Sequence, residues 1–123
     1  EDFRDPLPAS YYHAFQNIDG DPNQELVVVE NKSNTIIGMF QLSFIQYLTY
    51  CGGVRAQIEG VRIRSDQRGK GVGVQMFHWA IERSKARGAH LLQLTTDKKR
   101  PETVQFYKKL GFVDSHEGMK MHF

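Results

Sequence analysis

The first half of the chain alternates short apolar runs with turn residues. Three runs rich in β-branched and aromatic residues span residues 26–30, 35–44 and 56–64, and this composition is typical of β-strands. Residues 31–34 separate the first two runs, and residues 51–53 separate the second from the third. Because short connections join antiparallel neighbours, the pattern predicts a three-stranded antiparallel meander.

The spacing of apolar positions then changes to that of a helix. Between residues 71 and 87 one stripe of a helix would carry Val72, Met76, Phe77, Ala80, Ile81 and Ser84. Gly88 follows as a C-terminal cap, and residues 90–96 have the composition of another strand. A strand, a helix and a strand in this order predict a parallel strand pair with a right-handed crossover.

The two ends of the chain predict further elements. Residues 9–18 carry apolar side chains at helical spacing. A second helix is expected from Pro101 to Leu110, because proline suits the first helical turn and Gly111 stops the helix. Residues 112–123 predict a last hairpin with its turn at 115–118.

Composition narrows the class of protein. The 123 residues are expected to form a single domain, and a net charge of +2 is too small to argue for nucleic acid by itself. The one cysteine, Cys51, excludes an internal disulfide framework and fits a reducing, cytoplasmic compartment. No apolar run approaches the roughly 20 residues of a membrane helix, so no membrane partner is expected.

The junction between the third strand and the long helix carries the clearest chemical motif. Glycines alternate with other residues at Gly69, Gly71 and Gly73, where the absent side chains let the backbone turn and a ligand approach. Unpaired N–H groups at a helix start suit an anion, and Arg68 and Lys70 add two positive charges. This combination favours a phosphate- or pyrophosphate-binding loop, with a glycine-rich connection that binds nothing as the alternative.

Two better-known phosphate motifs do not fit this loop. A dinucleotide fingerprint requires G-x-G-x-x-G or A after a strand of a βαβ unit, but Val74 occupies the third small position. A P-loop requires G-x-x-x-x-G-K followed by Ser or Thr, which this region does not contain. The loop matches R-x-x-G-x-G instead, over residues 68–73, with Gln67 and a strand before it.

Together with two other segments, this loop resembles the GNAT superfamily of acyl-CoA-dependent N-acetyltransferases. The resemblance covers about residues 26–123 and rests on Gln67-Arg68-Gly69-Lys70-Gly71-Val72-Gly73, Ile58-Glu59-Gly60-Val61-Arg62-Ile63 and Phe106-Tyr107-Lys108-Lys109-Leu110-Gly111-Phe112. It implies an α/β fold with a mixed, mostly antiparallel sheet, helices on both faces and a splay between strands 56–64 and 90–96. Relatives usually have a further strand and helix before the equivalent of Ala9, so that part of the fold is expected to be missing or replaced by a partner.

The resemblance also implies acetyl-CoA as co-substrate and no metal. Its pyrophosphate would lie on the amides of residues 68–74, and its pantetheine arm would pair with the backbone of residues 61–63. Asp97 stands where many relatives have an asparagine that contacts the pantetheine arm, and Arg100 is a candidate for a phosphate or for an anionic substrate group. The implied cofactor-binding residues are Val61, Arg62, Ile63, Gln67, Arg68, Gly69, Lys70, Gly71, Val72, Gly73, Val74, Asp97, Arg100, Phe106 and Tyr107.

Two residues are candidates for catalysis. An amine is a cation at neutral pH and must lose a proton before it attacks a thioester, so Glu59 is a candidate general base; the alternatives are a solvated surface residue or a ligand for the substrate ammonium. Relatives use the tyrosine at the position of Tyr107 to protonate or hydrogen-bond the departing thiolate. The alternative for Tyr107 is a packed aromatic ring.

The function implied by the resemblance is transfer of an acetyl group from acetyl-CoA to a primary amine of a small molecule, by direct attack in a ternary complex. Residues 95–100 and 115–118 resemble small-molecule members, including aminoalkylphosphonate acetyltransferases. The alternatives are an acetyltransferase for proteins or peptides and a non-catalytic acyl-CoA-binding module. Relatives are commonly homodimers, and a homodimer is the expected assembly.

The remaining charged residues and histidines suggest no other ligand. Basic residues cluster near positions 62–70 and 98–100, but no stacking aromatics alternate with them, so nucleic acid is not an expected partner. The five histidines lack the spacing of a metal site. His116, in the last predicted turn, is a weaker candidate for a substrate contact.

Overall fold

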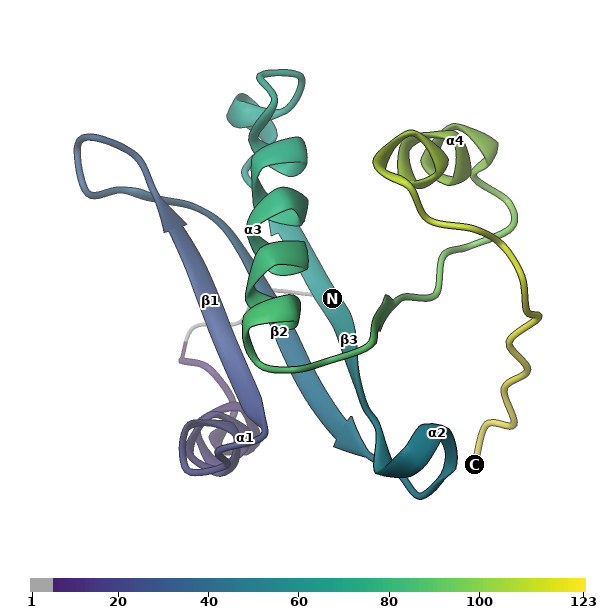
Figure 1. The fold of residues 1–123 in the computed structure, drawn as a ribbon. Helices are drawn as coiled ribbons and strands as arrows, with labels where there is room; N and C mark the ends of the chain where they lie inside the picture. Colours follow the sequence, from purple (N-terminus) through teal and green to yellow (C-terminus); the bar gives the residue numbers. More distant parts are fainter. Residues whose placement is uncertain (1–5) are drawn as a thin grey trace.

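The computed structural model describes residues 6–123 and contains one four-stranded sheet (Figure 1). The elements in order are α1 (Ala9–Asp19), β1 (Gln24–Glu30), β2 (Ile36–Gln46), α2 (Thr49–Gly52), β3 (Val54–Ile63), α3 (Val72–Ala86), β4 (Leu91–Gln93) and α4 (Pro101–Leu110). The strand order is β1-β2-β3-β4, with the first three antiparallel and β4 parallel to β3. The predicted meander and the predicted parallel pair are therefore confirmed.

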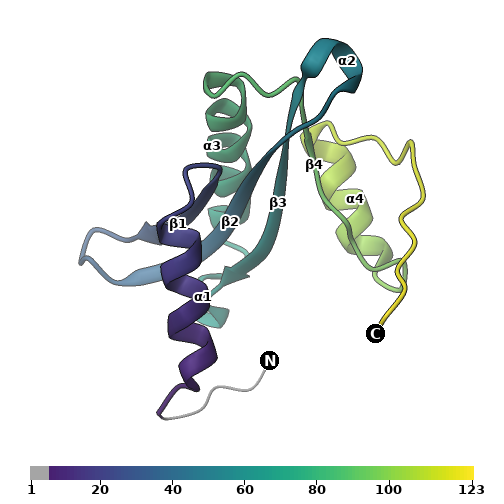
Figure 2. The ribbon, with the colours of Figure 1, turned by 90° about the horizontal axis from the view of Figure 1, so that it is seen from below.

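Helices cover both faces of the sheet, as expected. Helices α3 and α4 lie on one face, and α1 lies on the other, against β1 (Figures 1 and 2). The predicted stripe of α3 faces the sheet: Val72, Met76, Phe77, Ala80 and Ser84 are all buried. The 3.6-residue period thus selected the correct face of this helix.

The hydrophobic core lies between α3 and the middle strands. Alternate residues of β2 (Phe40, Leu42 and Phe44) are buried, while their neighbours face the opposite side of the sheet. Ala56 and Ile58 continue this buried layer on β3. Burial of one such large side chain contributes about 2–3 kcal/mol, so this layer holds the strands that carry the candidate site in a fixed place.

A bulge in β3 changes the direction of that strand beside the candidate base. Met39 pairs with Arg62, whereas Gln41 pairs with Glu59, so β3 contains one more residue than β2 over this interval. Gly60 lies within the interval and has a φ of +64°, a conformation that residues with a Cβ rarely adopt. The bulge therefore accounts for the glycine that follows Glu59.

Two elements differ from the sequence-based expectation. The strand expected at residues 90–96 is limited to Leu91–Gln93, because β3 bends away beyond Gln57 and no hydrogen-bonding partner remains. The final hairpin is wrong: residues 112–123 have no strand assignment and run as an extended trace from α4 (Figure 1). The alternation of Met119, Met121 and Phe123 has the period of a strand, but a strand also requires a paired backbone, and the short β4 does not provide one.

Candidate functional site

A pocket of about 280 Å³ opens where β3 and β4 separate. The strands are paired only from Arg55–Leu91 to Gln57–Gln93, and beyond this point their backbones diverge. The lining residues are Gln57, Ile58, Glu59, Gly60, Val61, Arg62, Phe77, Leu94, Thr95 and Tyr107. We call this space the splay pocket. It brings Glu59 and Tyr107, which are far apart in the sequence, to one cavity.

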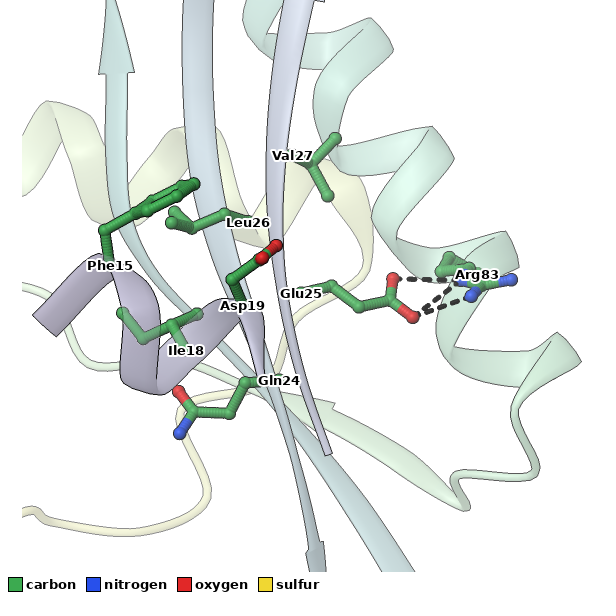
Figure 3. Close-up of a pocket in the computed structure, with 8 residues that line it drawn as sticks. All are labelled: Phe15, Ile18, Asp19, Gln24, Glu25, Leu26, Val27 and Arg83. Atoms are coloured by element: carbon green, nitrogen blue, oxygen red, sulfur yellow. Dashed lines mark hydrogen bonds and ion pairs between the residues drawn. The ribbon is translucent and has the colours of Figure 1, made fainter. Parts of the chain in front are cut away.

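A larger hollow of about 540 Å³ lies between α1, β1 and α3, at the other end of the sheet (Figure 3). Of its three charged lining residues, Glu25 and Arg83 bind each other, and Asp19 is the third. Arg83 donates to Glu25 with N···O distances of 2.6–3.2 Å, and Arg87 donates to the same carboxylate at 2.9 Å. Because this carboxylate is neutralised and its bonds tie α3 to β1, we interpret the hollow as structural despite its size.

Glu59 is exposed on β3, on the face of the sheet opposite α3. Its Oε1 accepts a hydrogen bond from Nε2 of Gln57 at 3.3 Å. Gln57 in turn accepts a hydrogen bond at Oε1 from Nε2 of Gln93, at 2.9 Å. The carboxylate therefore faces the splay pocket and water, where a cationic amine can reach it.

Tyr107 lies on α4 and forms part of the opposite wall of the splay pocket. Its ring packs edge-on against Phe77, Phe106 and Phe112, with centroid distances of 5.3, 5.5 and 5.8 Å. Burial raises the pKa of the Tyr107 phenol above its ordinary value of 10.0. The hydroxyl is thus protonated at neutral pH and can donate a hydrogen bond into the pocket.

The glycine loop lies between β3 and the amino end of α3. A single 3₁₀ turn at Ser65–Gln67 leads into it, and Gly71 immediately before the helix has a φ of +80° and a ψ of 8°. In the described part of the chain, the N–H groups of residues 69–74 have no backbone or side-chain acceptor. Such a row of free donors at a helix start fits a diphosphate.

The charges beside this loop add to the same preference. Arg64 pairs with Asp66 at 2.6 Å, whereas no carboxylate of residues 6–123 forms an ion pair with Arg68 or Lys70. Both of these side chains are exposed. Two cations and a set of free N–H groups therefore face solvent at one end of β3.

The edge of β3 beyond Gln57 is available to a ligand. On one side Arg62 and Ile63 pair with β2, but on the side of β4 no strand among the described residues continues the sheet. Unpaired strand backbone can form hydrogen bonds with an extended amide-bearing chain, as in β-augmentation. Val61 and Arg62 also line the splay pocket, so this edge leads from the glycine loop to Glu59.

Several other predicted site residues lie outside the pocket. Ile63 and Phe106 pack against the core, and a Cβ added to Gly73 would lie 3.3 Å from Ile63 and 3.5 Å from Phe106. Asp97 accepts a hydrogen bond from the N–H of Lys99 at 2.9 Å in the turn before α4. That turn ends at Arg100, the residue before α4, and both Asp97 and Arg100 are exposed.

The model of the acetyltransferase (GNAT) family matches residues 1–112. The chain belongs to the GNAT acetyltransferase family.

Relatives of this GNAT chain include named acetyltransferases. An L-methionine sulfoximine/L-methionine sulfone acetyltransferase of Pseudomonas aeruginosa is 38% identical over 61 residues, covering 49% of this chain and 36% of the relative. An aminoalkylphosphonate N-acetyltransferase of Salmonella typhimurium is 28% identical over 85 residues, covering 69% and 54%. The matched segments thus span about a third to a half of the length of these curated relatives.

Solved structures agree with the GNAT fold. A protein from Bacillus halodurans described as a transcriptional regulator is 56% identical, with a TM-score of 0.94; the match covers 100% of this chain and 81% of that one. A glucosamine-6-phosphate N-acetyltransferase from Arabidopsis thaliana is 20% identical, with a TM-score of 0.81 and coverage of 94% and 78%. At that identity the second likeness supports the fold alone.

Some residues in and beside the splay pocket were not predicted from the sequence. They include the amide pair of Gln57 and Gln93, and the pocket positions of Phe77, Leu94 and Thr95. Gln57 was open to detection, because it lies two residues before Glu59 on a strand and so shares its face. Gln93 required the parallel register, which no local pattern reveals.

Residues 6–123 contain no group of three or more His, Cys, Asp or Glu side chains that could hold a metal ion. None of their helices combines the length and the apolar character needed to cross a membrane.

Proposed function

We propose that this GNAT protein transfers an acetyl group from acetyl-CoA to a primary amine of a small molecule, by direct attack in a ternary complex. The observation that carries the proposal is the splay pocket: one cavity joins a carboxylate, a protonated phenol and a free strand edge. The glycine loop at the end of that edge supplies free N–H donors for a diphosphate. The pocket and the loop together suit a long anionic thioester at one end and a cationic amine at the other.

Glu59 is proposed as the general base. The carboxylate takes a proton from the substrate ammonium, directly or through water, and releases it to solvent. The neutral nitrogen then attacks the thioester carbonyl; the C–N bond forms, the C–S bond breaks, and the second N–H proton passes to the Glu59 carboxylate, which is ionised again, directly or through water. The balanced reaction converts ammonium and acetyl-CoA into the amide, the free thiol and one proton.

Tyr107 is proposed to stabilise the leaving thiolate. Burial raises the pKa of the Tyr107 phenol, which keeps the proton on the phenolic oxygen and makes its complete transfer to the thiolate less favourable. The contribution of Tyr107 is therefore a hydrogen bond that forms as charge develops on sulfur. The thiolate takes its final proton from solvent or from the acid formed at Glu59.

The strand edge is proposed to hold the thioester. Backbone N–H around Val61 would polarise the thioester carbonyl, while residues 61–63 pair with the pantetheine arm. Gln67 and residues 68–74 would hold the pyrophosphate, aided by the charges of Arg68 and Lys70. Asp97 and Arg100 lie in the turn before α4, where further contacts with the coenzyme are proposed.

The first experiment measures thiol release from acetyl-CoA with a panel of amines. Glu59→Gln should lower kcat by about 10²- to 10⁴-fold, and Tyr107→Phe by about 10- to 100-fold, with the KM for acetyl-CoA changed less than threefold. The matched control is Glu82→Gln, which removes a carboxylate from an exposed position of α3. Unchanged rates in both site variants would refute these roles.

The second experiment tests the coenzyme site without catalysis. Calorimetric titration with acetyl-CoA should show binding that weakens about tenfold when Arg68 and Lys70 are both changed to glutamine. Lys32→Gln, an exposed cation in the turn after β1, should leave the affinity unchanged. Failure of the unmodified protein to bind acetyl-CoA would refute the proposal directly.

The amine panel also decides the acceptor class. It should contain an aminoalkylphosphonate, methionine sulfone and an amino-sugar phosphate, which are the kinds of amine named for relatives. A peptide with a free N-terminus and a lysine tests the protein-directed alternative. Acetyl-CoA binding with no turnover of any amine would favour the alternative of a non-catalytic module.

We further propose a cytoplasmic homodimer. An exposed, unpaired Cys51 suits a reducing compartment, and the exposed apolar side chains of Met119, Met121 and Phe123 suit contact with another chain. Sedimentation equilibrium gives the mass in solution. A monomeric mass at micromolar concentration would refute the dimer.

A further inference from the structure

A chain of side-chain amides crosses from β4 to the proposed base. Gln57 and Gln93 are directly opposite each other in the last paired position before β3 and β4 separate. Nε2 of Gln93 donates to Oε1 of Gln57 at 2.9 Å, and Nε2 of Gln57 donates to Oε1 of Glu59 at 3.3 Å. All three side chains project from the same face of the sheet.

The donor and acceptor roles in these two hydrogen bonds determine the orientation of the Gln57 side-chain amide. An amide has one oxygen, which accepts, and one NH₂ group, which donates. With its oxygen bound to the Gln93 donor, Gln57 presents the NH₂ group to Glu59, which is the end that a carboxylate can accept from. The opposite orientation would place an oxygen against the carboxylate and repel it.

Glu59 needs such a partner because it is exposed. A free glutamate side chain samples several rotamers, and ordering it costs conformational entropy. A bound position prepared before the substrate arrives removes that cost from the reaction. Gln41 lies opposite Glu59 on β2, but the Gln41 amide donates to Gln24 instead.

We propose that Gln57 is a positioning residue that holds the Glu59 carboxylate toward the splay pocket, and that Gln93 acts through Gln57 by fixing the direction of its amide. The inference rests on the proposed role of Glu59 as base. It adds two residues to the machinery and assigns each a direction of hydrogen bonding.

Kinetics test the positioning role. Gln57→Leu and Gln93→Glu should each lower kcat about tenfold with the KM for acetyl-CoA within twofold of the unmodified value. Gln93→Glu can only accept, so it would turn the Gln57 amide around; Gln93→Lys can only donate, and should retain most of the rate. Ser43→Ala, on the other side of Gln57, is the control and should retain the full rate.

A double substitution separates the amide direction from simple charge. In the Gln57→Leu background, Gln93→Glu has no amide to turn, so its further effect on kcat should be less than twofold. Additive losses, or a Gln57→Leu variant with an unchanged kcat, would overturn the proposal. Unfolding midpoints of every variant show whether a loss in kcat comes from instability instead.

Nuclear magnetic resonance tests the amide chain without any turnover. The side-chain NH₂ signal of Gln57 should shift on Glu59→Gln, which removes the charged acceptor, and on Gln93→Glu. If the Gln57 NH₂ signal does not shift on Glu59→Gln, the proposed chain of hydrogen bonds is wrong, even if the variants lose activity as expected. If the signals shift as expected but Glu59→Gln keeps the full rate, the assignment of the base is wrong while the amide chain stands.

Discussion

The ion cluster formed by Glu25, Arg83 and Arg87 should contribute measurably to stability. The Glu25 side chain is 18% exposed, and its carboxylate accepts hydrogen bonds from the guanidinium groups of Arg83 and Arg87. Arg87 also lies over the ring of Phe44, with its Cζ 4.1 Å from the ring centroid. Glu25→Gln keeps the volume but leaves one acceptor oxygen and turns an NH₂ group toward the arginines. The perturbation therefore removes charge-assisted hydrogen bonds between α3 and β1 with little change in packing.

The expected loss is about 2 kcal/mol. Hydrogen bonds to a charged group contribute about 1.5–3 kcal/mol, and the larger exposure of Arg83 (42% of its side chain) places the total in the lower part of that range because water screens its pair. For a domain of this size, 1 kcal/mol corresponds to about 4 °C in Tm, so Glu25→Gln should lower Tm by about 8 °C.

The pH dependence gives a second signature of the same cluster. The hydrogen bond from Arg83, followed by that from Arg87, lowers the pKa of Glu25 below its ordinary value of 4.5. A lowered pKa in the folded state means that the stabilisation is complete above about pH 4.5 and is lost as the pH falls through the folded value. The difference in the free energy of unfolding between the unmodified protein and Glu25→Gln should therefore be constant near neutral pH and become smaller in acid.

Urea denaturation followed by circular dichroism, from pH 7 to pH 3, measures both effects. Glu82→Gln is the control, because Glu82 pairs with Lys85 at 3.4 Å with both side chains mostly exposed, and its substitution should change stability by less than about 0.5 kcal/mol. Equal midpoints for Glu25→Gln and the unmodified protein at pH 7 would refute the reasoning. A difference in the free energy of unfolding that stays the same from pH 7 to pH 3 would also refute it.

Other substitutions test the core, the loop and the pocket. Phe77→Ala, at a side chain only 2% exposed, should lower the free energy of unfolding by about 3–5 kcal/mol in urea denaturation. Gly71→Ala meets no atom within 4 Å but forces alanine to a φ of +80°, so it should cost about 1–2 kcal/mol by the same assay and raise the KM for acetyl-CoA. Since the folded pKa of Tyr107 lies above 10.0, stability should fall as the pH rises above about 10, and Tyr107→Phe should remove this part of the alkaline loss. Cys51 is exposed and should react with a thiol reagent in the folded protein as fast as in urea, and a slow reaction would show that it is covered.

Local periodicity predicted the elements that are defined by one buried face. The stripe of α3 was correct because a helix must turn its apolar residues toward the sheet, and Met76, Phe77 and Ala80 are consequently buried. The same reasoning failed for residues 112–123. Their alternation has the period of a strand, but pairing depends on a neighbour, and β4 ends at Gln93.

The bulge in β3 is a feature that the sequence alone does not explain. The glycine after Glu59 is visible in the sequence, and its φ of +64° follows only from the register in which β3 has one residue more than β2. The effect of the bulge on the site is a property of two strands together.

The groups that can do chemistry are visible in the sequence alone: the alternating glycines, the charges beside them, a glutamate on a strand and a tyrosine on a later helix. These depend on residue type and short-range spacing, which any segment carries with it. Which of these groups lie close together depends on how the helices and strands pack. The splay after Gln57 brings Glu59 and Tyr107 to one cavity, and the parallel register sets Gln93 opposite Gln57. Contacts between residues so far apart along the chain arise from the packing of whole elements, and no local pattern encodes them.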